Sequence, residues 1–254
     1  MWMKLYKQHM RSLGIIGFGG FGQFMVKYLQ PYIPVTVHDT ADLSKVAVEK
    51  GVSWGSLKEA ASKDIVILAV PVQFLEPVLV DIRGFLKPGT LVVDVSSVKV
   101  KPIDLMLEHL PPNIDVLGTH PLFGPQSGKN GIKGLNIVVC PVRTKKTRAI
   151  IRFLGQVLQL NVLERTPITH DKQMAYVQAL THFIGRSINE MDIPDVEQKT
   201  PAYQYLLDIK RNLGSDSMDL FLTIELENPY AKEVREHFME ELKNLNDKLE
   251  KMRK

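Results

Sequence analysis

The chain has 254 residues, of which 44% are hydrophobic and 24% are charged, a composition typical of a globular protein with a core of ordinary size. Its formal net charge of +4 is modest and its basic residues are spread along the chain, so we expect no nucleic-acid partner. No stretch is apolar for long enough to cross a membrane, the first residues lack a secretory apolar segment, and the single cysteine, Cys140, excludes an intramolecular disulfide, so we expect a cytoplasmic protein with no membrane partner.

The first two thirds of the chain alternates short apolar runs with segments long enough for helices. The predicted strands lie at 13–17, 35–39, 64–70, 91–95 and 115–118, with crossover helices such as 21–29 and 100–110 between them. Runs that are apolar on both faces are typical of a parallel sheet covered by helices on both sides. The pattern therefore predicts an α/β fold of the Rossmann type, a doubly wound sheet.

The last third of the chain has a different texture. Two more apolar runs, 136–140 and 160–163, are candidate edge strands around a helix at about 145–158, and helical spacing dominates after Thr166. Thr166-Pro167 is a suitable helix start, because proline is tolerated in a first turn. We therefore predict a dinucleotide-binding domain at 1–165 and a smaller all-helical domain at 166–254.

A glycine-rich segment follows the first predicted strand and opens the first helix. It matches G-x-G-x-x-G and consists of Gly17, Phe18, Gly19, Gly20, Phe21 and Gly22. In this context the pattern indicates dinucleotide binding, because glycines allow a tight turn and the helix N-terminus offers free N–H groups to a pyrophosphate. The alternative is a glycine-rich turn in some other α/β protein.

Asp39 ends the second predicted strand, about 20 residues after the loop, where an acid binds the ribose 2′-hydroxyl of NAD. A carboxylate would repel the 2′-phosphate of NADP, so the cofactor is predicted to be NAD, with NADP disfavoured. The alternative is that Asp39 only caps the turn 39–42.

Three segments follow strands at the carboxyl edge, where such sheets bind ligands. They contain Val70 and Pro71, then Ser96 and Ser97, and finally His120. We assign Val70, Pro71 and Ser96 to the cofactor site. A histidine held in a loop between prolines and glycines suits acid–base chemistry, although such a residue is as often a simple hydrogen-bonding group.

Several of these segments resemble prephenate and arogenate dehydrogenases. The longest is Gly118-Thr119-His120-Pro121-Leu122-Phe123-Gly124-Pro125-Gln126-Ser127-Gly128, joined by 94–99 (DVSSVK) and 181–186 (THFIGR). The segment 215–221 (SDSMDLF) is similar to the plant-type branch of that family. The resemblance covers nearly the whole chain in the expected order.

The resemblance implies an enzyme of tyrosine biosynthesis that decarboxylates a cyclohexadienol oxidatively, with NAD as hydride acceptor and no metal. His120 would accept the proton of the substrate hydroxyl, Ser97 would orient His120 and that hydroxyl, and His182 would contact the substrate. The helical domain would supply a homodimer interface. Each residue also has a plainer interpretation: Ser97 as the cap of the next helix, His182 as an interior residue, and Lys99 as a solvated first-turn residue.

The chain departs from the family at several positions. It lacks a Gly-Phe-Arg-Asp segment whose arginine binds a substrate carboxylate, which leaves Arg186, Lys210 and Arg211 as candidate cations. Gln126 stands where some relatives have an acid, and we count it among the substrate-binding residues. Asp216 could face the ammonium group of arogenate, but Ser215, Asp216 and Ser217 are equally good helix caps.

Two other functions stay open at this point. One is a hydroxyacid or imine dehydrogenase of the same two-domain plan, although a clear lysine base is missing from the long helix of the second domain. The other is a catalytically inactive NAD-binding sensor, which would be expected to lack His120 or Ser97.

Overall fold

The computed structural model describes residues 12–213 and 216–253, so the first 11 residues and Ser215 lie outside the described part. Contacts divide the chain into two compact units, residues 1–167 and 168–254. Among the described helices, none combines the length and the apolarity that a membrane span would require.

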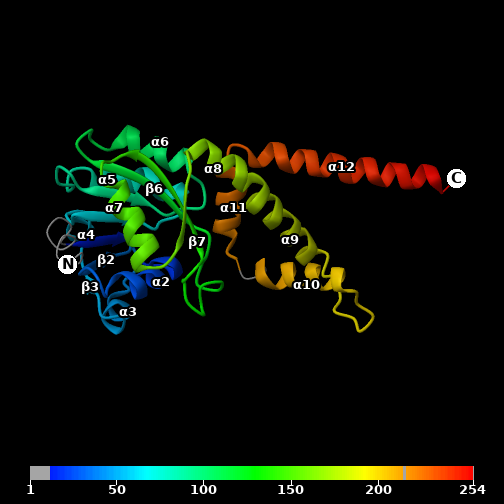
Figure 1. Cartoon of the computed structure of the whole chain (residues 1–254), viewed down its shortest axis with the longest axis horizontal. Helices are drawn as coiled ribbons and strands as arrows, with labels where there is room; N and C mark the ends of the chain where they lie inside the picture. The colour runs from blue at the N-terminus through cyan, green and yellow to red at the C-terminus, as the bar shows by residue number, and fades with distance from the viewer. Residues whose placement is uncertain (1–11, 214–215, 254) are drawn as a thin grey trace. The chain divides into compact units, whose positions relative to one another are not determined.

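The first unit contains one sheet of eight strands (Figure 1). The order is β3-β2-β1-β4-β5-β6-β7-β8, and all pairings are parallel except that of β6 with β7. The strands are β1 Leu13–Ile16, β2 Val35–His38, β3 Ser53–Trp54, β4 Ile65–Leu68, β5 Leu91–Asp94, β6 Asp115–Pro121, β7 Asn136–Arg143 and β8 Asn161–Glu164. The order 3-2-1-4-5-6 is that of a Rossmann sheet, so the predicted fold class is confirmed.

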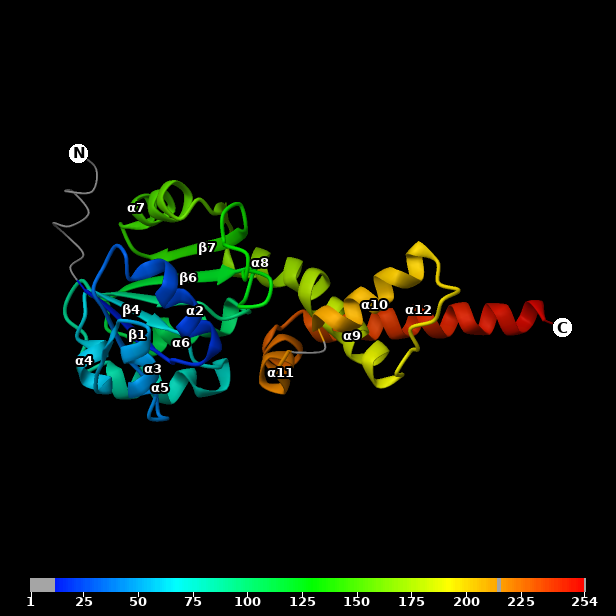
Figure 2. The same ribbon diagram turned by 90° about the horizontal axis from the view of Figure 1, so that it is seen from below.

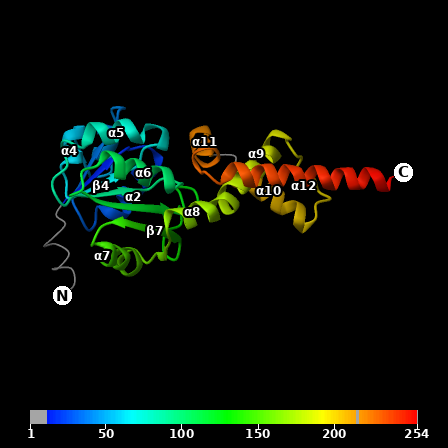
Figure 3. The same ribbon diagram turned by 90° about the horizontal axis from the view of Figure 1, so that it is seen from above.

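Helices cover both faces of this sheet because alternate strand residues point to opposite sides. One core cluster joins Leu68 and Val92 to α4 Leu57–Ala61, α5 Leu75–Ile82 and α6 Val100–His109. A second cluster, on the other face, contains α2 Gly20–Leu29, α3 Ser44–Glu49 and α7 Thr147–Arg152. Figure 3 shows α4, α5 and α6 on one side of the sheet and α7 on the other. Short 3₁₀ and π-helical turns, Val72–Phe74 and Phe153–Val157, complete the unit, and α7 with its π turn fills the predicted helix near 145–158.

The parallel strands place their carboxyl ends at one edge of the sheet. Ile16 pairs in register with Leu68, Leu68 with Asp94, and Asp94 with Gly118. The loops after β1, β4 and β5 and the last residues of β6 therefore meet at this edge, which positions the candidate site.

The second unit is entirely helical in its described part. Its helices are α8 Pro167–Met174, which a π-helical turn Ala175–Leu180 joins to α9 Thr181–Glu190, then α10 Pro201–Leu213, α11 Met218–Glu227 and α12 Ala231–Met252. The predicted helix start at Pro167 is confirmed. A small core of Ala179, Ile224 and Ala231 lies between the π turn, α11 and α12, and the far part of α12 extends past the other helices of this unit (Figures 1 and 2).

Candidate active site

Two glycines of the loop after β1 are required by packing. Gly17 has a φ of +96°, and a Cβ there would lie 2.4 Å from the carbonyl oxygen of Ala69. A Cβ on Gly22 would lie 2.2 Å from the carbonyl oxygen of Gly17. The first glycine therefore permits the tight turn, and the last lets α2 approach β1 closely.

Gly19 differs from these two because its surroundings are open. A Cβ at Gly19 would meet no atom within 4 Å. Gly19 is also the N-cap of α2, so no side chain caps the first N–H groups of this helix. The first turn of the helix contains no acidic residue. The loop therefore presents uncovered backbone and the positive end of a helix dipole, which fits the pyrophosphate of a dinucleotide.

Asp39 ties the end of β2 to this loop. Its Oδ2 accepts the backbone N–H of Phe18 at 2.6 Å, and its Oδ1 accepts that of Ala41 at 3.1 Å. Asp39 therefore caps its own turn and also lies beside the glycine loop, and its role in binding the ribose of NAD stays a prediction. The Phe18 ring is fully buried in the core, so only its backbone belongs to the loop surface, whereas Phe21 is half-buried.

The remaining residues assigned to the cofactor follow β4 and β5. Val70 is half-buried and packs on the core, Pro71 is exposed, and Ser96 is half-buried. All three follow strands that neighbour β1 or its partner β4, at the same edge as the glycine loop.

Ser97 and His120 come from adjacent strands. Ser97 follows β5 in a half-buried turn, and His120 lies near the end of β6 with only 4% of its surface exposed. Strand β6 continues through Pro121 and pairs His120 with Val138 of β7, so the prediction that His120 lies in a loop was wrong. The antiparallel ladder to β7 holds the histidine backbone more firmly than a loop would.

Lys99, not Ser97, is the N-cap residue of α6, so the capping interpretation of Ser97 was also wrong.

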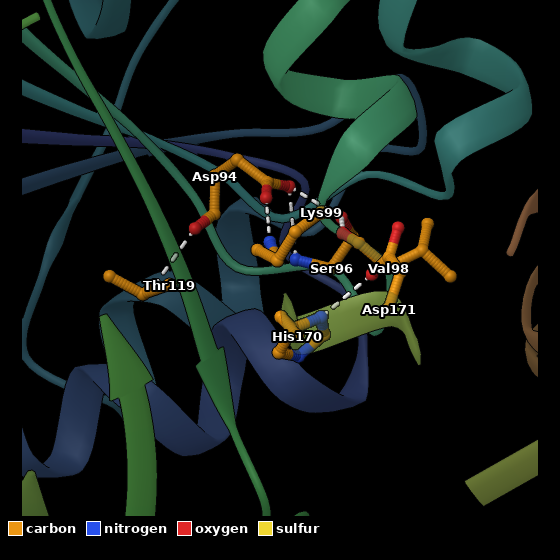
Figure 4. Close-up of polar contacts among 7 residues, drawn as sticks. All are labelled: Asp94, Ser96, Val98, Lys99, Thr119, His170 and Asp171. Carbon is orange, nitrogen blue, oxygen red and sulfur yellow. Dashed lines mark hydrogen bonds and ion pairs between the residues drawn. The ribbon is translucent and has the colours of Figure 1, made fainter. Parts of the chain in front are cut away.

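Figure 4 shows a cluster beside these residues that sequence reasoning missed. Lys99, interpreted as a solvated residue, is fully buried and forms an ion pair with Asp94. Asp94 also accepts hydrogen bonds from Ser96, and its main-chain oxygen accepts one from Thr119. A lysine five positions after a strand-ending aspartate was the available signal, but a burial this deep depends on the packing of α6 on β6.

His182 and Asp216, predicted separately, are paired in the second unit. Their Nδ1 and Oδ2 atoms are 3.6 Å apart, and their side chains are 11% and 29% exposed. Burial lowers the pKa of His182, partly offset by the charge of Asp216. Burial likewise raises the pKa of Asp216, partly offset by His182. Ser217, whose Oγ accepts the Leu220 N–H at 3.2 Å, is the N-cap of α11, so Asp216 is not that cap.

The three candidate cations differ in their ion-pair and hydrogen-bond partners. Lys210 donates to Asp192 at 2.8 Å and to the Ile193 carbonyl oxygen, and Arg211 pairs with Asp208 and is 71% exposed. Arg186 lies one turn after His182 on α9. Its guanidinium stacks 5.6 Å from the centre of the Phe221 ring, and its Nε is 3.5 Å from Glu190.

Two further features complete the placement of the predicted residues. Gln126 is exposed in the loop between β6 and β7. His170 and Asp171 of α8 form a pair that the sequence did not suggest, with Nδ1 and Oδ1 2.7 Å apart and both side chains fully buried (Figure 4). Asp171 also accepts a hydrogen bond from Asn228 through its main-chain oxygen. Among the described residues, no group of three or more His, Cys, Asp or Glu side chains is suited to hold a metal ion.

Comparison with known proteins identifies the family. Residues 33–160, half of the chain, match the model of the prephenate dehydrogenase nucleotide-binding domain. The chain belongs to the prephenate dehydrogenase family. The family resemblance seen in the sequence motifs is thereby confirmed, and residues 187–254 match a second model, the TYRAAT1-like C-terminal domain.

Named relatives of this family are similar over most of the chain. Arogenate dehydrogenase 1, chloroplastic, of Arabidopsis thaliana is 34% identical across 94% of this chain, and the match covers 39% of that protein. A probable arogenate/prephenate dehydrogenase of Methanocaldococcus jannaschii is 29% identical across 93% of this chain and 56% of its own length. A third relative, Arogenate dehydrogenase 2, chloroplastic, of Arabidopsis thaliana, is covered over 66% of its length. The chain thus spans about 39–66% of the length of these three curated relatives.

Solved structures share the fold. Prephenate dehydrogenase from A. aeolicus, in complex with hydroxyphenyl propionate and NAD+, has a TM-score of 0.76 and 23% identity, covering 95% of this chain and 91% of the other. Synechocystis arogenate dehydrogenase has a TM-score of 0.71 and 17% identity, covering 95% of this chain and 93% of the other.

Proposed function

We propose that the chain is an NAD-linked prephenate or arogenate dehydrogenase, an oxidoreductase of tyrosine biosynthesis. One observation carries the proposal. In a chain of this family, the open glycine loop and the strand ends bearing Ser97 and His120 meet at one edge of the same sheet. Ligands of doubly wound sheets bind at that edge.

The chemistry proposed for these residues is the one that the family resemblance implies, and their shared position at this edge supports it. Bound NAD supplies the hydride acceptor for C4 of the cyclohexadienol. His120 takes the proton of the C4 hydroxyl, and Ser97 orients that hydroxyl toward the imidazole. The nearly complete burial of His120 excludes water from the proton transfer, and loss of CO2 makes the ring aromatic.

The preference for NAD rests on Asp39. Its carboxylate is held beside the glycine loop by the Phe18 N–H at 2.6 Å. A fixed negative charge there accepts a ribose hydroxyl and repels a 2′-phosphate. The residues assigned to NAD are Gly17, Phe18, Gly19, Gly20, Phe21, Gly22, Asp39, Val70, Pro71 and Ser96.

In the second unit, His182 and Asp216 are proposed to bind the substrate side chain. Arogenate carries an ammonium group where prephenate carries a keto oxygen, and Asp216 is a carboxylate with 29% of its side chain exposed. Its pairing with His182 supports a shared role for the two residues. A preference for arogenate is therefore proposed, with Gln126 as a further contact from the β6–β7 loop.

Arg186 is proposed to bind a substrate carboxylate in place of the arginine that the family motif would supply. Among the described residues its only ion-pair partner is Glu190, through Nε, so the two Nη groups are available for a bidentate contact. The Phe221 ring supports the guanidinium, and both residues border an open hollow of about 410 Å³. Lys210 and Arg211 already have partners of their own.

A homodimer is proposed from the surface of the second unit, within the proposed substrate and dimerisation domain 166–254. Phe238, Leu242, Leu245, Leu249 and Met252 recur at alternating spacings of four and three along α12, and the last four are 47–73% exposed. Such a stripe is a coiled-coil seam that lacks its partner within the described part of its own unit. Residues 1–165 would then form the dinucleotide-binding domain.

A cytoplasmic location remains our proposal, supported by the lone buried cysteine, Cys140. The Arabidopsis relatives are chloroplastic by name. Localising a tagged full-length protein in its own cells would decide between these compartments.

The proposed function is tested by following absorbance at 340 nm with purified protein and NAD, with prephenate and then with arogenate. We expect NADH with at least one of them, and His120→Asn should lower kcat by about 10²- to 10⁴-fold because it removes the base. If folded protein binds NAD but turns over neither substrate, the proposed function is wrong. The two remaining functions are then a hydroxyacid or imine dehydrogenase and an inactive NAD-binding sensor.

A further inference from the structure

The Lys99–Asp94 pair is the most deeply buried ion pair between the described lysines and acids. The side chains of Lys99 and Asp94 are 0% and 2% exposed. Removing two charges from water is costly, and packed apolar side chains of similar volume are often at least as stable. Stability alone is therefore a weak reason for an ion pair at this position.

Asp94 connects the two strand ends that carry Ser97 and His120. Its Oδ1 accepts the N–H of Ser96 at 3.0 Å and the Ser96 hydroxyl at 2.6 Å. Its main-chain oxygen accepts the Thr119 hydroxyl at 2.9 Å. Figure 4 shows Asp94 between these groups, so one residue holds the turn before Ser97 and the residue before His120.

Lys99 supports the same arrangement from the opposite side. A Cβ on Gly118 would lie 3.2 Å from Lys99 Cδ, so the aliphatic part of the lysine packs directly on the β6 backbone before Thr119. The Lys99 carbonyl oxygen also accepts the N–H of Ile103 at 3.2 Å, which fixes the lysine at the start of α6. Lys99 therefore contacts β5 through its ammonium group, β6 through its stem and α6 through its backbone.

We propose that Lys99 and Asp94 are positioning residues that lock the Ser97 turn against the end of β6, so that Ser97 and His120 keep a fixed spacing. Neither touches the reacting atoms, and both act through Ser97 and His120. The kinetic test of this inference rests on the proposed function. The structural test does not, because it follows the NMR signal of the His120 imidazole directly.

The test uses the double variant Lys99→Met with Asp94→Asn. It removes both charges of this ion pair together, and the new amide oxygen can still accept the Ser96 bonds. We expect NAD to bind with unchanged Kd, kcat to fall by about 10- to 100-fold because the two groups are misaligned, and the NMR resonance and titration of His120 to shift. Adding Ser97→Ala to this variant should cost much less than Ser97→Ala costs in the wild type, because both changes disturb one arrangement.

The matched control lies at the other end of β6. Lys146 and Asp115 form an ion pair at 2.9 Å, with side chains 32% and 27% exposed. Lys146→Met with Asp115→Asn makes the same chemical change at the amino end of the strand, and it should leave kcat and the His120 resonance unchanged. Thr119→Val, which removes one uncharged hydrogen bond, is the second variant should the Lys99 double variant fail to fold, and it should shift His120 in the same direction.

An unshifted His120 resonance in folded Lys99 double variant or in Thr119→Val would overturn the proposal, as would additive effects with Ser97→Ala. The NMR readout needs no turnover. A wild type that is inactive on both substrates would contradict the proposed function, and the His120 titration would still decide the positioning role.

Discussion

Replacing Gly19 by alanine should separate cofactor binding from stability in this protein. An alanine Cβ at this position meets no atom within 4 Å, and the backbone angles, φ −66° and ψ −166°, are open to any L-residue. The substitution therefore introduces neither a clash nor backbone strain, and its only new feature is a methyl group in the open space above the loop.

The two expected effects have opposite signs. A glycine-to-alanine change at a compatible site stabilises a protein by about 0.4–1 kcal/mol through the unfolded state. For a domain of this size that raises Tm by about 1–4 °C. The methyl group keeps a pyrophosphate from the loop, and losing one N–H bond to a charged oxygen, worth about 1.5–3 kcal/mol, should raise the Kd for NAD by about 10- to 150-fold.

Isothermal titration with NAD and thermal unfolding measure these two effects. Gly84→Ala is the matched control, because a Cβ at Gly84, which follows α5 outside the residues assigned to NAD, also meets nothing within 4 Å, and it should add stability without weakening NAD binding. Gly22→Ala should lose stability, since its Cβ would lie 2.2 Å from the Gly17 carbonyl oxygen. Wild-type NAD affinity in a stabilised Gly19→Ala protein would refute the assignment of this loop to the pyrophosphate.

Four other substitutions give directional predictions. Asp39→Ala should weaken NAD binding by about tenfold and raise the relative affinity for NADP, measured by titration with both dinucleotides. Arg186→Gln should raise KM by about 10-fold or more, with a smaller effect on kcat, because it removes a charge-assisted contact. Leu245→Glu should convert the proposed dimer to a monomer in light scattering after gel filtration. Asp216→Asn should lower the arogenate-to-prephenate preference in kcat/KM, and it should lower the pKa of His182 further by removing the charge that raises it, as followed by NMR.

The last substitution also has a stability consequence. The pKa of His182 is lower in the folded state than in the unfolded state. Its contribution to the free energy of unfolding is therefore present above the unfolded-state pKa and is lost as pH falls through the folded-state pKa. Asp216→Asn lowers the folded-state pKa of His182 further, which widens the gap between its folded-state and unfolded-state pKa. The free energy of unfolding of the variant should therefore fall more steeply on acidification than that of the wild type.

Each prediction has an outcome that contradicts it. Equal losses for NAD and NADP would remove Asp39 from cofactor discrimination. Arg211→Gln, at a side chain 71% exposed, should leave KM unchanged, and an equal effect in both arginine variants would remove Arg186 from substrate binding. A dimer that survives Leu245→Glu, or one that is lost in Lys251→Glu on the opposite side of α12, would contradict the proposed seam. An unchanged substrate ratio in Asp216→Asn would contradict a role in the choice of arogenate.

Local sequence determined the sheet and the glycine loop. Strands β1 and β4 and the first three residues of β5 are apolar on both faces because helices cover both sides of the sheet, and that requirement is visible within a run of three or four residues. The roles of Gly17 and Gly22 follow from a strand–turn–helix context that can be read without coordinates. The family motifs likewise lie within short segments. Strand β3, by contrast, has only two residues, which is too short to leave a periodic signal.

The tertiary structure alone decided which side chains have partners. Lys99 follows a strand in a polar segment, and only the packing of α6 on β6 reveals that it is buried against Asp94. His120 lies in a strand because β7 pairs with it from a later part of the chain. His182 and Asp216 meet because α9 and the start of α11 lie side by side. Periodicity reports the environment of a residue relative to its immediate neighbours, whereas the partner of a charge is set by contacts between distant segments, which exist only once the chain has folded.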